Sequence, residues 1–211
     1  MMVRPLLLAA LVLPTILAAQ SRIGLDASID VSTTTLIRQV STERTFTGPV
    51  IGGAALIGLG RFELDGRYQQ GSLTPEAGLT TDPEDLVDLS VHLNYRIRPW
   101  VRVGAGPRLR AFIAPAGTVR WTRVEVRTRM EGSVIPGMIA VHAELWFAPM
   151  VETNVQGGGS SARGGNVGLS LRLPRAPLDL RLSYGADRAE YASGGSEFLD
   201  EISIAIVLRR Q

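Results

Sequence analysis

Hydrophobic and polar residues alternate along most of this chain with a period of two. In RFELDGRYQQ, residues 61–70, the charged residues Asp65 and Arg67 share one phase, and Phe62 and Leu64 share the other. Strict alternation predicts a β-strand with two unlike faces. If the charges point outward, the chain is a water-soluble barrel. If they point inward, it is a membrane barrel.

Runs of this kind recur along the chain, separated by clusters of Gly, Pro, Ser and Asp, and they predict an all-β protein. Ten strands are expected, and the number falls to eight if 139–155 does not form two crossings. The predicted strands span 22–31, 49–58, 61–70, 86–97, 101–113, 138–147, 150–156, 166–173, 178–187 and 200–209.

The predicted connections fall into two alternating classes. Four are tight, at 58–60, 98–100, 148–150 and 174–177, and five are longer and polar, at 32–48, 71–85, 114–134, 156–165 and 188–199. In an antiparallel meander every second connection lies at the same end, so this barrel has short turns at one end and long loops at the other. Outer-membrane barrels have short periplasmic turns and long extracellular loops.

Three stretches do not follow the simple pattern of strands and connections. The segment 118–130 also alternates, but we assign it to an extracellular hairpin, because strands there would leave Arg or Glu in the lipid phase. The glycine-rich stretch GGGSSARGG, 157–165, is expected to be a flexible loop. Pro107 lies inside the fifth strand and predicts a β-bulge, because a closed barrel has no edge that tolerates proline.

The cost of charge in lipid decides which phase faces outward. Each predicted strand has about 8–12 alternating residues, close to the length that a tilted strand needs to cross a bilayer. An arginine at the bilayer midplane costs about 2–4 kcal/mol. We therefore expect Phe62, Leu64 and Tyr68 to face lipid and the charged phase to face the lumen.

The N-terminus has the features of a secretory signal peptide. Arg4 precedes an apolar run from Leu6 to Leu17, and cleavage is expected after Ala19. The predicted domains are therefore a signal peptide over 1–19 and a single barrel domain over 20–211.

Composition excludes several other classes of protein. All 22 basic residues are arginine and nearly balance the 20 acidic residues, and they form no basic block of the kind that binds nucleic acid. The chain has no cysteine, which excludes disulfides and thiolate metal sites.

The signal, the alternation and the turn–loop asymmetry together resemble the small bacterial outer-membrane β-barrel proteins. The resemblance implies a single antiparallel up-and-down transmembrane barrel in the bacterial outer membrane. Its implied partners are outer-membrane lipid and the barrel assembly machinery. In that family the last strand usually ends in an outward aromatic residue, whereas here Leu208 is the last outward apolar residue.

Charged and histidine side chains of the inward phase are expected to fill the lumen, because buried charges persist only when they are paired and hydrogen-bonded. A structural plug is favoured over a narrow polar conduit. Asp65 and Arg67 are each expected to pair with the second or fourth strand, with Asp88, His92 and Arg96 as candidates. The predicted lumen network comprises Asp26, Glu63, Asp65, Arg67, Asp88, His92, Arg96, Arg102, Arg108, Arg110, His142, Glu144, Arg172, Asp179, Arg181 and Glu201.

These features favour a non-enzymatic outer-membrane barrel with a structural or interaction role. One alternative is a narrow channel, or a barrel that binds a small ligand. Another is an outer-membrane hydrolase, either a protease or a lipid A-modifying enzyme, that uses His92 or His142. A secreted soluble barrel is the remaining alternative. No catalytic site, metal site or cofactor is predicted, and the sequence does not identify a ligand.

Overall fold

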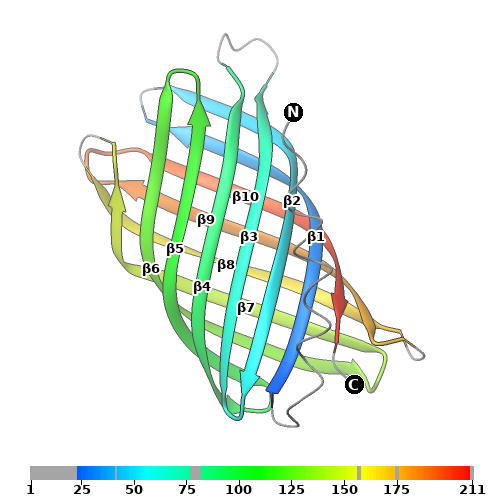
Figure 1. The fold of residues 1–211 in the computed structure, drawn as a ribbon. Helices are drawn as coiled ribbons and strands as arrows, with labels where there is room; N and C mark the ends of the chain where they lie inside the picture. The colour runs from blue at the N-terminus through cyan, green and yellow to red at the C-terminus, as the bar shows by residue number, and fades with distance from the viewer. Residues whose placement is uncertain (1–22, 41, 77–81, 156–157, 174–175, 210–211) are drawn as a thin grey trace.

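The computed structural model describes residues 23–40, 42–76, 82–155, 158–173 and 176–209, so the predicted signal peptide lies outside the described residues. Ten strands form one closed barrel (Figure 1). Their bounds are β1 Ile23–Gln39, β2 Glu43–Leu59, β3 Phe62–Pro75, β4 Glu84–Arg98, β5 Val101–Ala114, β6 Gly117–Ile135, β7 Ile139–Thr153, β8 Gly159–Arg172, β9 Leu178–Tyr191 and β10 Ser196–Leu208.

Each strand pairs antiparallel with the next strand in sequence, and β1 closes the barrel by pairing with β10. Ala27 lies opposite Leu208 and Gln39 lies opposite Ser196. The start of β1 and the end of β10 therefore lie at the same end, which we call the turn end, and the opposite end is the loop end. The predicted ten-stranded antiparallel barrel is confirmed. None of the described residues forms a helix long and apolar enough to cross a membrane.

One of the ten predicted strands does not exist as a separate strand, one real strand was not predicted, and the two errors cancel in the count. The segment 118–130 is no hairpin, because it lies within the continuous strand β6. The run 150–156 is no separate strand, because residues 150–153 are the end of β7. The hairpin assignment was wrong because Arg123, Glu125 and Arg127 share one phase and are all buried in the lumen.

Two of the prolines that lie in strands, Pro107 and Pro149, have effects opposite to those predicted. Pro149 was placed in a tight turn, but it lies inside β7, where the β6–β7 ladder shifts register between Val124 and Val126. Pro107 was expected to mark a bulge, but Ser90 opposite Arg108 and Leu93 opposite Ala105 keep one register around it. A proline has no N–H group to donate to the ladder. At Pro107 the ladder is therefore interrupted, but no extra residue is inserted.

Most of the predicted long loops are strand. β1 continues to residue 39, and β2 already begins at residue 43. The predicted flexible loop at 157–165 belongs to strand β8 from Gly159 onward. The outward side chains of these strand extensions are mostly polar, with Ile37, Ile113 and Phe198 as apolar exceptions. Polar outward residues include Thr33, Thr47, Gln70, Ser72, Thr74, Asp85, Arg120, Thr122, Glu152, Arg163 and Arg188. We call this loop-end part of the barrel the rim.

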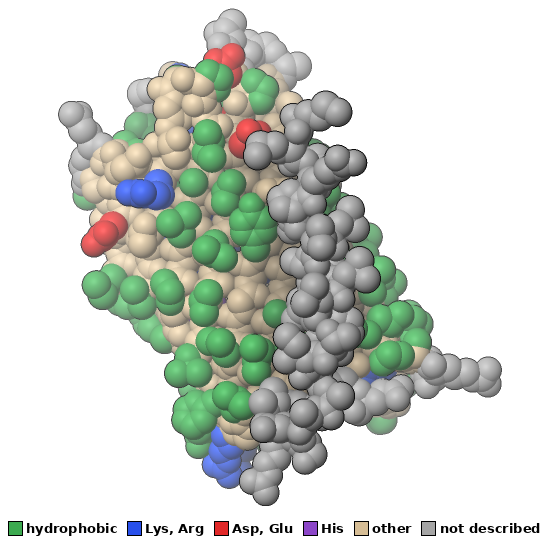
Figure 2. Space-filling view, in the orientation of Figure 1, with side chains coloured by type: hydrophobic (Ala, Val, Ile, Leu, Met, Phe, Trp, Pro, Cys, Tyr) green, Lys and Arg blue, Asp and Glu red, His purple; other side chains and the backbone are tan. Residues whose placement is uncertain are grey.

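Between the rim and the turn end, the outer wall is apolar. Figure 2 shows hydrophobic side chains across the middle of the visible face, with charged side chains toward the ends. The exposed residues of this band include Ile29, Val31, Ile51, Leu64, Leu89, Leu93, Val126, Leu145, Val167, Leu182, Ile202 and Ile204. Such a band matches the outward face of a membrane barrel. The prediction that Phe62, Leu64 and Tyr68 point outward is confirmed.

Inside the rim the pattern is reversed, because the buried side chains there are apolar. Phe46, Phe112 and Trp121 are each 1% exposed, and Leu36 and Leu73 are fully buried. We call this inner apolar cluster the cap; it also contains Val50, Leu86, Trp146, Ala148, Ala162, Ala189, Tyr191 and Leu199. The same strands are therefore apolar outside and charged inside along the band, and polar outside and apolar inside along the rim. In a rim surrounded by water, apolar residues are stabilised by facing inward.

The three tryptophans test this arrangement directly, because one lies on the outer wall and the other two lie in the cap. Trp100 is 55% exposed at the turn end, whereas Trp121 and Trp146 are 1% and 7% exposed inside the barrel. In vesicles with brominated acyl chains, we expect Trp100→Phe to remove most of the lipid-dependent quenching of tryptophan fluorescence. The fluorescence that remains should resist both brominated lipid and aqueous iodide. Strong iodide quenching of the variant would contradict the sealed cap.

Candidate functional site

The candidate site is the lumen, where side chains from all ten strands meet in successive layers. The inward phase of each strand delivers one residue to a layer, and the tilt of the strands brings residues of non-adjacent strands together. The layers from the loop end are the apolar cap, a buried charged belt, a polar cavity and the turn-end aperture.

A clasp of hydrogen bonds ties the cap together across the barrel. Arg38 on β1 donates two bonds to Glu84 on β4, at 2.7 and 3.1 Å, and one to Glu197 on β10, at 2.7 Å. Trp121 Nε1 and the Tyr191 hydroxyl also donate to Glu197. The two carboxylates and the guanidinium are thus satisfied inside an apolar layer at the loop end of the lumen.

The charged belt lies directly below the cap and contains Asp88, Arg108, Arg110, Arg123, Glu125 and Asp187. Arg110 Nε donates to Asp88 at 2.6 Å, and its two terminal nitrogens donate to Asp187 at 2.8 Å each. Arg108 also donates two hydrogen bonds to Asp88, each of 2.8 Å. Arg110 is on β5 and Asp187 is on β9, so this bidentate pair spans the lumen.

His92 belongs to the same belt. His92 Nε2 lies 3.1 Å from Glu125 Oε2, and both residues are 2% exposed. Glu125 also accepts a bond of 2.7 Å from Arg123, whose guanidinium carbon lies 4.3 Å from the Trp146 ring centroid. The contact pairs Nε2 of this buried histidine with a carboxylate, whereas Nδ1 is buried without a hydrogen-bond partner.

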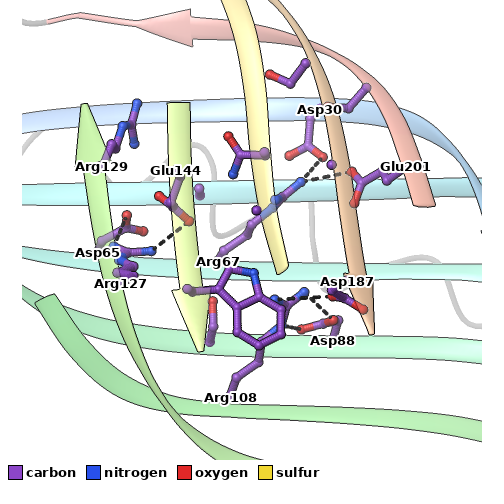
Figure 3. Close-up of a pocket in the computed structure, with 18 of the residues that line it drawn as sticks. Asp30, Asp65, Arg67, Asp88, Arg108, Arg127, Arg129, Glu144, Asp187 and Glu201 are labelled. Carbon is purple, nitrogen blue, oxygen red and sulfur yellow. Dashed lines mark hydrogen bonds and ion pairs between the residues drawn. The ribbon is translucent and has the colours of Figure 1, made fainter. Parts of the chain in front are cut away.

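The cavity below the belt has a volume of about 170 Å³ and is lined by Arg67, Arg127, Arg129, Glu144 and Arg181 among others. Figure 3 shows Arg67 pointing toward Asp30 and Glu201, with N–O distances of 3.2 and 3.1 Å.

Arg127 makes the second group of contacts in this cavity. Its guanidinium contacts Asp65 at 2.7 Å and Glu144 at 3.9 Å. The expected pairing of Asp65 and Arg67 with the second or fourth strand is therefore wrong. Asp65 reaches β6, and Arg67 reaches β1 and β10, because long side chains extend across the narrow lumen.

The turn-end aperture contains the remaining predicted lumen residues. Glu63 is 1% exposed and is held by Arg96 and by Arg102, the latter at 2.8 Å. Asp179 contacts Arg209 at 2.8 Å. Asp26 and Arg172 lie in the inward phases of β1 and β8 and are half-buried.

Part of the network was not predicted from the sequence. Arg123, Glu125, Arg127, Arg129 and Glu131 were left out because 118–130 was assigned to a hairpin. Their strict spacing at odd positions is the signal that could have identified them. The clasp residues Arg38, Glu84 and Glu197 were missed because they lie in segments predicted to be loops.

The lumen offers little that could act as a reactive centre. His142 lies 3.4 Å from Ser183 Oγ and is 8% exposed, and no carboxylate contacts it within hydrogen-bond distance among the described residues. In the part of the chain that the structure covers, no group of three or more acidic or histidine side chains is placed to hold a metal ion. The prevailing chemistry is mutual neutralisation of arginine and carboxylate.

Comparison with solved structures identifies the type of fold. The outer membrane protease OmpT from Escherichia coli is 10% identical, with a TM-score of 0.51 over 90% of this chain and 96% of that protein. An outer membrane channel from Pseudomonas putida F1 is 14% identical, with the same TM-score and the same coverage. No protein-family model matches the sequence, and no curated protein matches it. The chain has the fold of bacterial outer-membrane β-barrels, as its sequence predicted.

Proposed function

We propose that this protein is an integral outer-membrane barrel with a closed lumen, a structural component that presents a rigid rim above the membrane surface. The single observation that carries this proposal is the bidentate Arg110–Asp187 pair across the lumen, beneath a cap in which Trp121 is 1% exposed. Two successive layers therefore block passage from the loop end to the turn end.

The outer wall supports the membrane location. The apolar band continues around the barrel, from Ile29 and Val31 on β1 to Ile204 on β10. Water does not stabilise so much exposed apolar surface, whereas a bilayer does. Outer-membrane lipid and the barrel assembly machinery are accordingly the expected partners.

The two histidines argue against the hydrolase alternative. One structural neighbour is a protease, but the likeness is one of fold. His92 is 2% exposed and is occupied by Glu125, so no macromolecular substrate reaches it. His142 faces the closed lumen from β7. Neither residue lies at the loop-end surface, where an extracellular substrate would arrive.

Conductance in planar lipid bilayers tests the proposal against the channel alternative. We expect the wild-type barrel to insert without discrete conductance steps. The double variant Trp121→Ala/Arg110→Ala removes the largest side chain of the cap and the cross-lumen pair of the belt, so it should conduct where it folds. Reproducible ion-conducting steps from the wild-type protein would refute a closed lumen.

A further inference from the structure

Two arginines that line the lumen cavity lack the carboxylate partner that neighbouring arginines have. Among the residues that the structure describes, no carboxylate oxygen lies within 4.0 Å of the Arg129 or Arg181 guanidinium. The Nε atom of Arg129 is buried and has no hydrogen-bond partner. Arg181 donates one bond of 3.3 Å, to the neutral Ser170 hydroxyl.

The nearby carboxylates do not compensate, because other arginines hold them. Glu144 lies opposite Arg129 in the β6–β7 register, yet its closest cationic contact is Arg127. Figure 3 shows Arg129 without an interaction to Glu144 or Asp65, both of which contact Arg127. Glu131, two positions further along β6, contacts Arg102 at 3.3 Å. Arg129 therefore has no ion-pair partner within 4.0 Å, although Glu131 is close enough to attract it electrostatically.

The cavity lining as a whole has seven carboxylates and six arginines, so the imbalance at Arg129 and Arg181 is local and arises from how these groups pair. Asp30 and Glu201 form ion pairs with Arg67, just as Asp65 and Glu144 contact Arg127. Arg129 and Arg181 are the two lining arginines left over, and they are close enough for their charges to repel. A charge that is not compensated inside a low-dielectric interior is costly. An anion between the two guanidinium groups would remove both the repulsion and the missing hydrogen bonds.

The cavity has the size and the donors for a small oxyanion. Its volume of about 170 Å³ exceeds the space that one water needs, which is roughly 10–15 Å³. Ser183 and His142 line it beside the two arginines. Gly168 permits this arrangement, because a Cβ there would lie 2.5 Å from His142 Cε1 and 2.8 Å from Ser183 Oγ.

We infer that Arg129 and Arg181 form a binding site for a small free oxyanion, of the phosphate, sulfate or carboxylate class. The planar guanidinium groups suit the bidentate recognition of such anions. The anion enters from the turn end, since the cap seals the loop end and the aperture side chain of Arg96 is 40% exposed. The inference goes beyond a closed structural barrel, because it gives the lumen a ligand.

Equilibrium dialysis with radiolabelled inorganic phosphate tests the site in the full chain, folded in a phosphate-free maltoside detergent. We expect saturable binding of about one phosphate per barrel, with sulfate competing. Arg129→Gln and Arg181→Gln should each weaken binding by about tenfold or more, since each removes one charge-assisted contact. Arg163→Gln is the matched control, because Arg163 is exposed on the outside of the rim, and it should bind as the wild type does.

Heat-modifiable gel mobility establishes that each variant is folded before binding is measured. Absence of saturable phosphate binding by the wild-type barrel would overturn the inference, whatever the variants do. It would also be overturned if both lumen variants bound phosphate as tightly as Arg163→Gln. Because the assay uses detergent and no added lipid, saturable binding identifies the free anion rather than a lipid headgroup. Failure here leaves the conductance result untouched, so the two proposals are tested separately.

Discussion

Replacing Arg110 by alanine should lower the free energy of unfolding by about 3–5 kcal/mol, the usual cost of breaking a buried ion pair from one side. Arg110 and Asp187 are 5% and 8% exposed and share two hydrogen bonds of 2.8 Å. The change would leave Asp187 with Arg123 at 3.4 Å as its nearest hydrogen-bond donor. Urea unfolding in liposomes measures the effect.

The double variant Arg110→Ala/Asp187→Ala provides the thermodynamic cycle. Removing both partners eliminates the uncompensated charge, so part of the stability should return. Arg163→Ala, on the outside of the rim, should stay within about 0.5 kcal/mol of the wild type. If Arg110→Ala were no worse than Arg163→Ala, the belt would not stabilise the barrel.

Three arginine substitutions on β3 should differ sharply, although they lie on one strand. Leu64→Arg places a charge in the apolar band and should cost about 2–4 kcal/mol. Leu73→Arg places a charge in the cap, where Leu73 is fully buried, and should be at least as harmful. Thr74→Arg should be tolerated, because Thr74 is exposed on the outside of the rim.

Folding yield and urea unfolding in liposomes measure all three β3 variants. Thr74→Arg is the matched control, since it introduces the same side chain one residue away from Leu73. If Leu73→Arg folded normally and Thr74→Arg did not, the rim would have the same polarity as the band, with an inner face that accepts charge and an outer face that does not. The reversal of the two faces along the strand would then be wrong.

The sequence was sufficient for the fold wherever a strand had charged and apolar phases in the membrane band. Leu93 and His92 on β4 are one such pair, and they point outward and inward as their phases require. The prediction was wrong where the inward phase changes from charged to apolar and the outward phase from apolar to polar. Leu36 and Phe46 belong to an inward apolar phase beside polar Thr33 and Thr47, and a constant lipid-facing phase cannot describe both. These strand extensions were therefore taken for loops.

The lumen residues were predictable as a phase but not as pairs. Alternation alone places Asp65 and Arg67 inside, because the period of a strand is two. Their actual partners, Arg127 for Asp65 and Asp30 and Glu201 for Arg67, depend on strand tilt and on side-chain reach across the lumen. Neither is encoded in the local pattern. The cap clasp of Arg38, Glu84 and Glu197 likewise forms only when β1, β4 and β10 close the barrel.

Site-directed spin labelling of outward positions on β3 tests the central claim most directly, and the chain has no native cysteine to interfere. Labels would replace Leu64, Tyr68, Gln70, Ser72 and Thr74 one at a time in liposomes, and collisions with oxygen and with a water-soluble nickel chelate would be measured. We expect lipid-like oxygen accessibility at positions 64 and 68 and chelate accessibility at 70, 72 and 74, because the rim stands outside the bilayer around an apolar cap. Lipid-like accessibility continuing to position 74, or chelate accessibility at position 64, would contradict this arrangement.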